Sequence, residues 1–372
     1  MSVAIRGVGT SHFSKQRETP VTELAWRAVT EALEDAEVDD VDAVYVGTVF
    51  GGPGVAQRVL HGLGIVGVPV VTIENACASG TSAFAEAHAA ISSGRYERVL
   101  ALGVEQMTSA FDGAIHPELT DVEGRSGLAM PALYAMAAQR YLYEGKVTLE
   151  ELASVAVKNH RHALHNDRAQ QGGDNTVEQV LGSTMIADPL TLWQCCPISD
   201  GAAAAVLAPA SRPQDVPIRS VAARSGDLWD HRSPNVWGFD LVADTAARAY
   251  EQAGIGPGDL DVVEVHDAFT IGEITTTEAL GIVPVGAAGR AAADGETAVG
   301  GRLPVNPSGG LLSRGHPLGA TGLAQIAEVV WQLRGHAGGR QVDGARTGLV
   351  ETMGGGVSGI DGNACVVTVL GA

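Results

Sequence analysis

A cysteine stands where the sequence predicts the start of a helix. Cys77, in ENACASGTSAF, follows the apolar, strand-like run VVTI. Unpaired N–H groups and the positive end of a helix dipole at such a place favour the thiolate, the nucleophilic form of cysteine. Its neighbours Ala76, Ala78, Ser79 and Gly80 are small and leave room for a substrate. The pattern predicts a nucleophile, with an inert buried thiol as the competing interpretation.

Two histidines lie in settings suited to proton transfer. His316 ends a Gly-rich turn, NPSGGLLSRGHPLGATG, just before a helix whose first turn accommodates Pro317. A histidine there could take the proton of Cys77 or polarise a carbonyl. His266 follows the apolar strand LDVVEV, at the carboxyl end where α/β sheets place ligands. A purely structural role for His266 stays open.

A run of glycines follows another predicted strand. Gly354, Gly355 and Gly356 can bring backbone N–H groups close to a developing oxyanion, or form a tight turn. The glycines before His316 lack a Walker lysine or a GxGxxG fingerprint after a strand, which disfavours nucleoside triphosphate and dinucleotide binding.

The spacing of metal-ligating residues predicts no metal site. His160, His162 and His165 do not share one helical face, so we expect a solvated helix end. Cys195 and Cys196 are adjacent, which is unsuitable for a shared tetrahedral metal.

The elements around these residues are duplicated. A helix, an acidic linker and a strand near residues 22–50 recur near 242–270, where Asp42 corresponds to Asp261. Cys77 and His316 each open a helix that a strand follows. Alternating helices and strands that are apolar on both faces predict layered α/β architecture with buried sheets. The two helix starts would then meet near a pseudo-twofold axis.

The predicted domain organisation has three parts. Residues 1–115 form one half, with a return strand near 197–210, and residues 211–372 form the other. Residues 116–196 have no duplicate and are predicted to be an inserted loop domain.

Composition narrows the class of protein. The chain has 372 residues and a net charge of −19, which disfavours nucleic acid and anionic membranes as partners. The sequence contains no run of 18 uninterrupted apolar residues, so a membrane span is not predicted. Four unevenly placed cysteines in so long a chain indicate free thiols and a cytoplasmic location.

Taken together, the motifs resemble those of the thiolase family. The matching elements are C-x-S at 77–79, H-D-A-F at 266–269, G-H-P at 315–317 and a terminal x-x-G-G-G at 352–356. The H-D-A-F form resembles sterol-carrier-protein-type and archaeal thiolases, among them acetyl-CoA acetyltransferases. The resemblance implies a five-layer αβαβα fold, coenzyme A thioester substrates with no permanently bound cofactor, and a homodimer or dimer of dimers.

The resemblance also implies roles for individual residues. Cys77 would form an acyl-enzyme, His316 would activate it, and His316 with His266 would bind the thioester oxygen. The amides of Cys77 and Gly354 would form a second oxyanion hole. The substrate channel would be lined by Cys196, Ser308 and Phe269.

One departure from the family pattern concerns the second catalytic cysteine. Relatives carry it in the C-x-G loop or in H-D-C-F, where this chain has Thr352 and Ala268. Neither side chain shuttles a proton at neutral pH, so the acid/base would be His266 or His316.

The sequence therefore predicts a thiolase-like C-acyltransferase that catalyses Claisen condensation or thiolysis of 3-ketoacyl-CoA, most simply an acetyl-CoA acetyltransferase. Three alternatives remain: acyl transfer to a carbon nucleophile not linked to CoA, a thiolase-fold retro-aldolase, and a non-catalytic lipid- or CoA-binding subunit. Members of this branch often work with a small partner protein that carries a zinc ribbon and an OB fold. The resemblance therefore implies such a partner for this chain.

Overall fold

The computed structural model describes residues 2–115, 119–230 and 232–371. The predicted boundary at residue 116 lies outside the described residues, and the three-part domain division stays a prediction.

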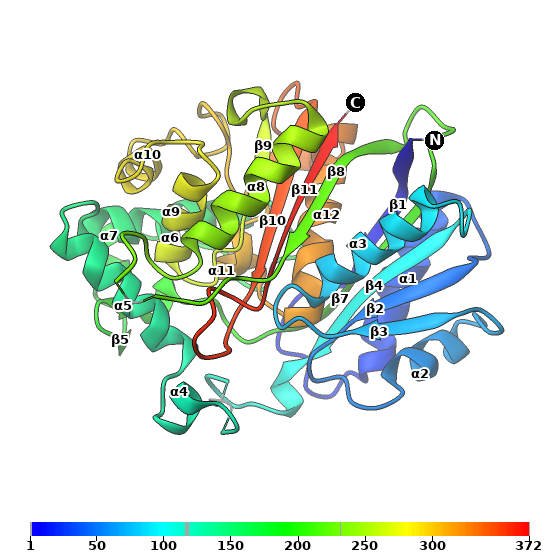
Figure 1. Cartoon of the computed structure of the whole chain (residues 1–372), viewed down its shortest axis with the longest axis horizontal. Coiled ribbons are helices and arrows are strands. Elements are labelled where there is room, and N and C mark those ends of the chain that lie inside the picture. Colours follow the sequence, from blue (N-terminus) through cyan, green and yellow to red (C-terminus); the bar gives the residue numbers. More distant parts are fainter. Residues whose placement is uncertain (1, 116–118, 231, 372) are drawn as a thin grey trace.

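A single mixed sheet runs through the molecule (Figure 1). It has nine strands in the order β3-β2-β4-β7-β1-β8-β11-β10-β9. The first five belong to one half: β1 (Val3–Thr10), β2 (Ala43–Gly47), β3 (Val70–Ile73), β4 (Val99–Gln106) and β7 (Asp200–Pro209). The others form the second half: β8 (Val216–Arg224), β9 (Val262–Glu264), β10 (Thr347–Gly354) and β11 (Ala364–Gly371). The halves join through a short β1–β8 pairing at Ala4–Pro217 and Ile5–Val216.

Helices cover both outer faces of the sheet and fill the space between the halves. Helices α1 (Val21–Ala36) and α2 (Val55–Gly62) cover the first half, and α8 (Phe239–Ala253) covers the second. Between the halves lie α3 (Ser79–Ser92) and α12 (Leu318–Arg334), whose apolar residues share one core with strands of both halves (Figure 1). The layers therefore follow the predicted αβαβα order.

The remaining elements belong to the connection between β4 and β7 and to the connections within the second half. They are η1 (Met107–Ser109), α4 (Val122–Arg125), α5 (Met130–Tyr143), α6 (Leu149–Ala163), α7 (Val177–Leu181), β5 (Met185–Ala187), β6 (Leu190–Thr191), η2 (Leu192–Gln194), η3 (Pro257–Asp259), α9 (Thr270–Ala279), α10 (Ala288–Ala293), α11 (Gly310–Arg314) and η4 (Gly338–Arg340). Side chains of α5, α6 and α9 share a core with α8 and its strands. The segment between β4 and β7 is therefore packed onto the second half through α5 and α6.

The duplication is visible in equivalent hydrogen bonds. The carboxylate of Asp42 accepts the amides of Glu97 and Arg98 at 2.9 and 2.8 Å, at the start of β4. The carboxylate of Asp261 accepts the amides of Arg346 and Thr347 at 2.8 and 2.9 Å, at the start of β10. Each aspartate thus aligns a helix–strand unit in the same way, as the repeat in the sequence predicts.

Glycines allow the two central helices to approach the first half closely. A Cβ added at Gly80 or at Gly103 would lie 2.3 or 2.1 Å from the carbonyl oxygen of Gly319. Any larger residue would collide with backbone that cannot yield. The starts of α3 and α12 are therefore held against each other, and these starts carry Cys77 and His316.

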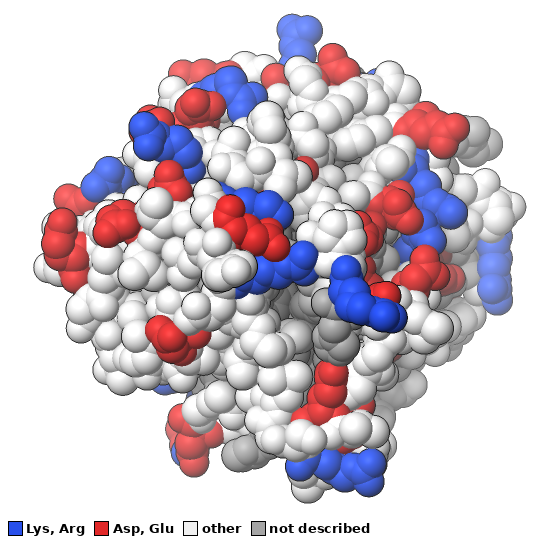
Figure 2. Space-filling view, turned by 60° about the vertical axis from the view of Figure 1, so that its left-hand side comes forward, with Lys and Arg blue, Asp and Glu red and all other residues white. Residues whose placement is uncertain are grey.

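The surface matches the composition. Figure 2 shows acidic and basic side chains interspersed over a largely uncharged face. Among the described helices, none is both long and apolar enough to span a membrane.

Candidate active site

A strained turn presents Cys77 between β3 and α3. Ala76 has a φ of 48°, in the left-handed region that costs a residue with a Cβ about 1–2 kcal/mol. The hydroxyl of Ser79 accepts the amide of Asn75 at 2.8 Å and donates to the carbonyl of Ala76 at 2.6 Å. The side chain of Asn75 in turn donates to Ser82 at 2.9 Å. These bonds hold the turn in the shape that directs the sulfur away from the helix.

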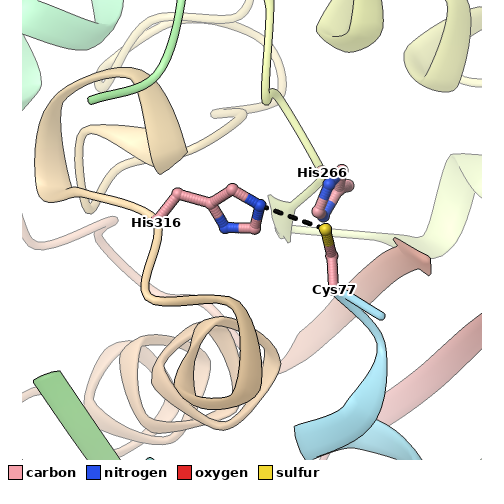
Figure 3. Close-up of side chains that lie close together, drawn as sticks. All are labelled: Cys77, His266 and His316. Atoms are coloured by element: carbon pink, nitrogen blue, oxygen red, sulfur yellow. Dashed lines mark hydrogen bonds between the residues drawn. The ribbon is translucent and has the colours of Figure 1, made fainter. Parts of the chain in front are cut away.

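His316 faces that sulfur. Its Nε2 lies 3.3 Å from Cys77 Sγ, and its Nδ1 lies 2.7 Å from Thr321 Oγ1 (Figure 3). The hydroxyl of Thr321 already donates its only proton to the carbonyl of Pro317 at 3.0 Å. It must therefore accept the proton of Nδ1, which leaves Nε2 as an unprotonated acceptor facing the thiol.

His266 closes the other side of the sulfur. A ring nitrogen points toward Cys77 in Figure 3, and its ring meets that of His316 edge-on, with centroids 5.0 Å apart. The His266 amide donates to the buried carboxyl of Glu351 at 2.9 Å. Its Nδ1 is buried and has no hydrogen-bond partner among the described residues. Cys77, His266 and His316, predicted from separate motifs, thus lie together.

The three groups are neutral at rest. Burial lowers the pKa of His266 to about 3 and, with His266 as a neighbour, holds the pKa of His316 well below its usual value. Removal of water around the sulfur raises the pKa of Cys77 to about 12, although part of the residue stays accessible. Backbone hydrogen bonds from Cys77 and Gly355 oppose that rise without cancelling it. Burial therefore opposes the thiolate that the helix start favours, and the thiol must lose its proton to a base such as His316 during the reaction.

The glycine run approaches the nucleophile turn from β10. A Cβ at Gly354 would lie 2.2 Å from the carbonyl oxygen of Asn75, so only glycine fits there. Gly355, one of the three glycines whose N–H groups the sequence predicts near a developing oxyanion, supplies a backbone hydrogen bond to the Cys77 sulfur. The predicted oxyanion role of Gly354 with Cys77 stays a prediction, and Gly355 is a further donor at the same place.

The two positions where relatives keep a second cysteine are occupied differently. The hydroxyl of Thr352 donates to Gln325 at 2.7 Å and is fully buried against α12. The carbonyl of Ala268 accepts the amide of Cys196 at 2.9 Å. Neither position supplies a second acid/base, and His266 and His316 stay the predicted groups for that role.

The three predicted channel residues have different surroundings. The backbone of Cys195–Cys196 runs against Ala268–Phe269, through the amide of Cys196 and a bridge between Cys195 and Phe269. Ser308 is fully buried, and its hydroxyl donates to Glu264 at 2.8 Å, so its side chain stabilises the Gly-rich turn. Lining of a substrate channel by Cys196, Ser308 and Phe269 stays a prediction.

Tyr134, in α5, joins the site from the inserted segment and was not predicted. Its ring packs on Phe269 with centroids 4.6 Å apart and meets Trp237 edge-on at 5.8 Å. A cavity of about 20 Å³ lies beside these rings. It is bordered by Tyr134, Trp237, His266 and Met353. That volume exceeds the 10–15 Å³ needed for one water molecule. No pattern in the sequence indicates this cavity, because it forms only when α5, α8 and α9 pack together.

Of the three histidines predicted to form a solvated helix end, His165 is exposed but the other two are not. His160 and His162 are buried. His162 Nδ1 lies 2.9 Å from the carbonyl oxygen of Asn306, and its Nε2 accepts the amide of Val299 at 3.1 Å. The expectation was wrong for His160 and His162, because α6 packs with His162 against the loop before His316 and with His160 against Trp193.

The bond between Thr321 and His316 leads to a first prediction. Thr321→Val keeps the shape of the buried side chain but removes the acceptor that fixes the His316 tautomer. Loss of such a supporting hydrogen bond typically costs about 10–100-fold in activity. We expect a decrease of that size in the rate of Cys77 acylation in stopped-flow measurements. Thr321→Ser retains the hydroxyl and should stay near the wild-type rate; equal losses in both variants would contradict this role.

Two family profiles match the chain. Residues 3–211 match the thiolase N-terminal domain, and residues 227–367 match the thiolase C-terminal domain-like family.

Proteins with similar sequences agree with these profiles. An acetyl-CoA acetyltransferase from Methanothermobacter thermautotrophicus is 44% identical over 95% of this chain and 96% of its own length. Benzoylsuccinyl-CoA thiolase subunit BbsB from Thauera aromatica is 39% identical over 95% of each chain. Human sterol carrier protein 2 is 37% identical over 99% of this chain and 71% of its own. The expected branch of the family is confirmed.

A solved structure of the Ltp2-ChsH2(DUF35) aldolase superposes with a TM-score of 0.83 at 27% identity, covering 100% of this chain and 98% of that one. The chain belongs to the thiolase family and has the fold and acyltransferase function of that family.

Proposed function

We propose that this chain is an acetyl-CoA acetyltransferase in which Cys77 carries the acyl group. The observation that carries the proposal is the 3.3 Å contact between Cys77 Sγ and His316 Nε2, with the His316 tautomer fixed by Thr321. The 44% identity to an archaeal acetyl-CoA acetyltransferase supports the choice of substrate. Coenzyme A thioesters are the substrates we assign, with no resident cofactor.

The first half-reaction forms the acyl-enzyme. As the Cys77 sulfur attacks the thioester carbonyl of acetyl-CoA, its proton passes to His316 Nε2. The amides of Cys77 and Gly354 or Gly355 stabilise the oxyanion, and each such donor is worth about 2.7–4 kcal/mol. The C–S bond to coenzyme A then breaks, and the leaving thiolate takes the proton from His316. The products are acetylated Cys77 and free CoA.

The second half-reaction needs a base for the α-carbon of a second acetyl-CoA. We assign this role to His266. Its Nδ1 makes no hydrogen bond with the described residues, and His266 borders the water-sized cavity. The resulting carbanion attacks the acetyl carbonyl and expels the Cys77 sulfur, which recovers a proton from the imidazolium. Acetoacetyl-CoA is released, and thiolysis is the reverse.

We place the acyl group in the cavity that His266 and Met353 border. Met353 narrows it, since the Met353 thioether fills the space next to Gly238. We expect Met353→Ala to raise the preference for butyryl-CoA over acetyl-CoA by about tenfold, because each methylene accommodated is worth roughly 1–3 kcal/mol. The preference is measured as the ratio of the acylation rates with butyryl-CoA and acetyl-CoA. Met107→Ala truncates a buried methionine in η1 and should leave the preference unchanged; an equal shift in both variants would contradict it.

Direct acylation tests the function. The protein is incubated with acetyl-CoA and digested, and the peptide containing Cys77 is examined for the mass of one acetyl group. Acetylation at Cys77 with release of CoA supports the proposal. Failure to acylate, with or without a partner subunit, would favour the non-catalytic lipid- or CoA-binding class.

A retro-aldolase is the second candidate, favoured by the similarity to the Ltp2-ChsH2(DUF35) aldolase. The contact between Cys77 and His316 argues against it, since aldol cleavage needs no acyl-enzyme. An acyl acceptor not linked to CoA stays open as a variant of the second half-reaction.

We also infer that the chain assembles with itself and with a partner. Strand β3 lies at the edge of the sheet, and Val71 on it is 44% exposed, as an edge that pairs with a second copy would require. A partner protein of the zinc-ribbon and OB-fold type is supported by two relatives, one described as a subunit and one solved with a DUF35 protein. The four free cysteines fit a reducing compartment such as the cytoplasm.

A further inference from the structure

The catalytic residues also form a set of metal-ligating atoms. One ligand atom each from Cys77, His266 and His316 lie within 4.8 Å of one another. They come from positions far apart in the sequence, so the spacing rules that predicted no metal site could not detect them. The two histidines are buried, while Cys77 as a residue is partly accessible.

The distances suit a zinc ion with little rearrangement. At ordinary bond lengths, a tetrahedral zinc ion places a sulfur and a nitrogen ligand about 3.6 Å apart and two nitrogen ligands about 3.3 Å apart. The Cys77 Sγ–His316 Nε2 distance is 3.3 Å. The remaining separations stay below 4.8 Å, so each needs to close by at most roughly 1.5 Å. Rotation of the His266 side chain, whose Nδ1 makes no hydrogen bond, can supply this movement.

The ligand chemistry suits zinc as well. Imidazole and thiolate are the ligands that zinc prefers, and three protein ligands leave its fourth position open. Both imidazoles are neutral and ready to bind. The hydrogen bond from His316 Nδ1 to Thr321 provides the support that metal-bound histidines usually have. A water molecule in the adjoining cavity can do the same for His266.

We propose that Cys77, His266 and His316 bind one zinc ion reversibly and that the bound ion blocks the nucleophile. Binding forms one Zn–S and two Zn–N bonds, and the thiol proton of Cys77 leaves to solvent. No oxidation or reduction is involved. Because the sulfur cannot bond to zinc and attack a thioester at the same time, zinc and acylation exclude each other.

The test measures metal binding directly. Metal-free protein, kept reduced, is titrated with zinc sulfate against a chromophoric chelator, and X-ray absorption of the loaded protein reports the ligands. We expect one zinc per chain and a shell of one sulfur and two imidazole nitrogens. Cys77→Ser should weaken binding by at least about 100-fold, since it removes the thiolate ligand. Wild-type protein alkylated at Cys77 with iodoacetamide should behave like the variant, which excludes a folding effect.

Cys196→Ser is the matched control, because Cys196 lies near Cys77 and outside the ligand set. We expect it to bind zinc within about twofold of the wild type. A zinc shell without sulfur, a loss of binding in Cys196→Ser but not in Cys77→Ser, or the absence of binding at micromolar zinc would overturn the proposal. None of these measurements depends on catalytic turnover. Failure of the zinc proposal can therefore be distinguished from failure of the proposed acetyltransferase function.

Discussion

Replacing Cys77 by alanine abolishes the acyl-enzyme and lowers thiolysis of acetoacetyl-CoA by roughly 10⁴–10⁶-fold, the range expected when a nucleophile that works as a unit with its base is removed. The Cys77 sulfur forms the covalent acyl-enzyme, which divides the reaction into two steps. Without the thiol, His316 loses the group 3.3 Å away whose proton it accepts. Release of CoA from acetoacetyl-CoA and the mass of the Cys77 peptide measure the effect.

Cys195→Ser provides the control for this experiment. Its thiol donates to the carbonyl of Thr191 at 3.3 Å, a bond that serine can make. It should retain most of the activity. If Cys77→Ala kept thiolase activity, the nucleophile would have to be sought elsewhere. Aldol cleavage that survives in Cys77→Ala would favour the retro-aldolase.

His266→Asn separates the two half-reactions. Asparagine retains a hydrogen-bond donor but cannot take a proton, so the variant should still form acetylated Cys77 at a rate within about tenfold of the wild type. Condensation of two acetyl-CoA molecules should fall by about 10²–10⁴-fold, the usual contribution of a general base. Single-turnover acylation and steady-state condensation, measured on the same preparation, reveal the difference.

His88→Asn is a suitable comparison, since His88 lies on α3 well beyond the turn that presents Cys77. It should change neither rate. Equal losses in both half-reactions of His266→Asn would assign the base role to His316 and restrict His266 to holding the thioester oxygen.

The sequence alone identified the reacting groups but not their protonation states. The sequence motifs around Cys77, His266 and His316 are enough to predict these residues as the reacting groups. The resting state depends on burial, which raises the pKa of Cys77 and lowers the pKa of His266. Burial is a property of the packed molecule, and in this site it outweighs the helix-start effect that the sequence suggests.

Supporting residues were harder to predict for a similar reason. Thr321 acts through a bond to a side chain five residues away across a helix start, and Tyr134 reaches the site from the inserted segment. His162 looks like a surface residue in the sequence, yet α6 buries it against the loop before His316. Duplication and layer order were predictable, since helix and strand periodicity repeat in both halves.

The origin of the site in two halves also governs how the enzyme can fail. Cys77 comes from the first half, and both histidines come from the second. Their meeting rests on the contact of Gly80 and Gly103 with the backbone of Gly319, where even one methyl group would force the helix starts apart. Heat or denaturant that separates the halves should therefore inactivate the enzyme before either half loses its own helices and strands. Loss of turnover would precede the fall in far-ultraviolet circular dichroism.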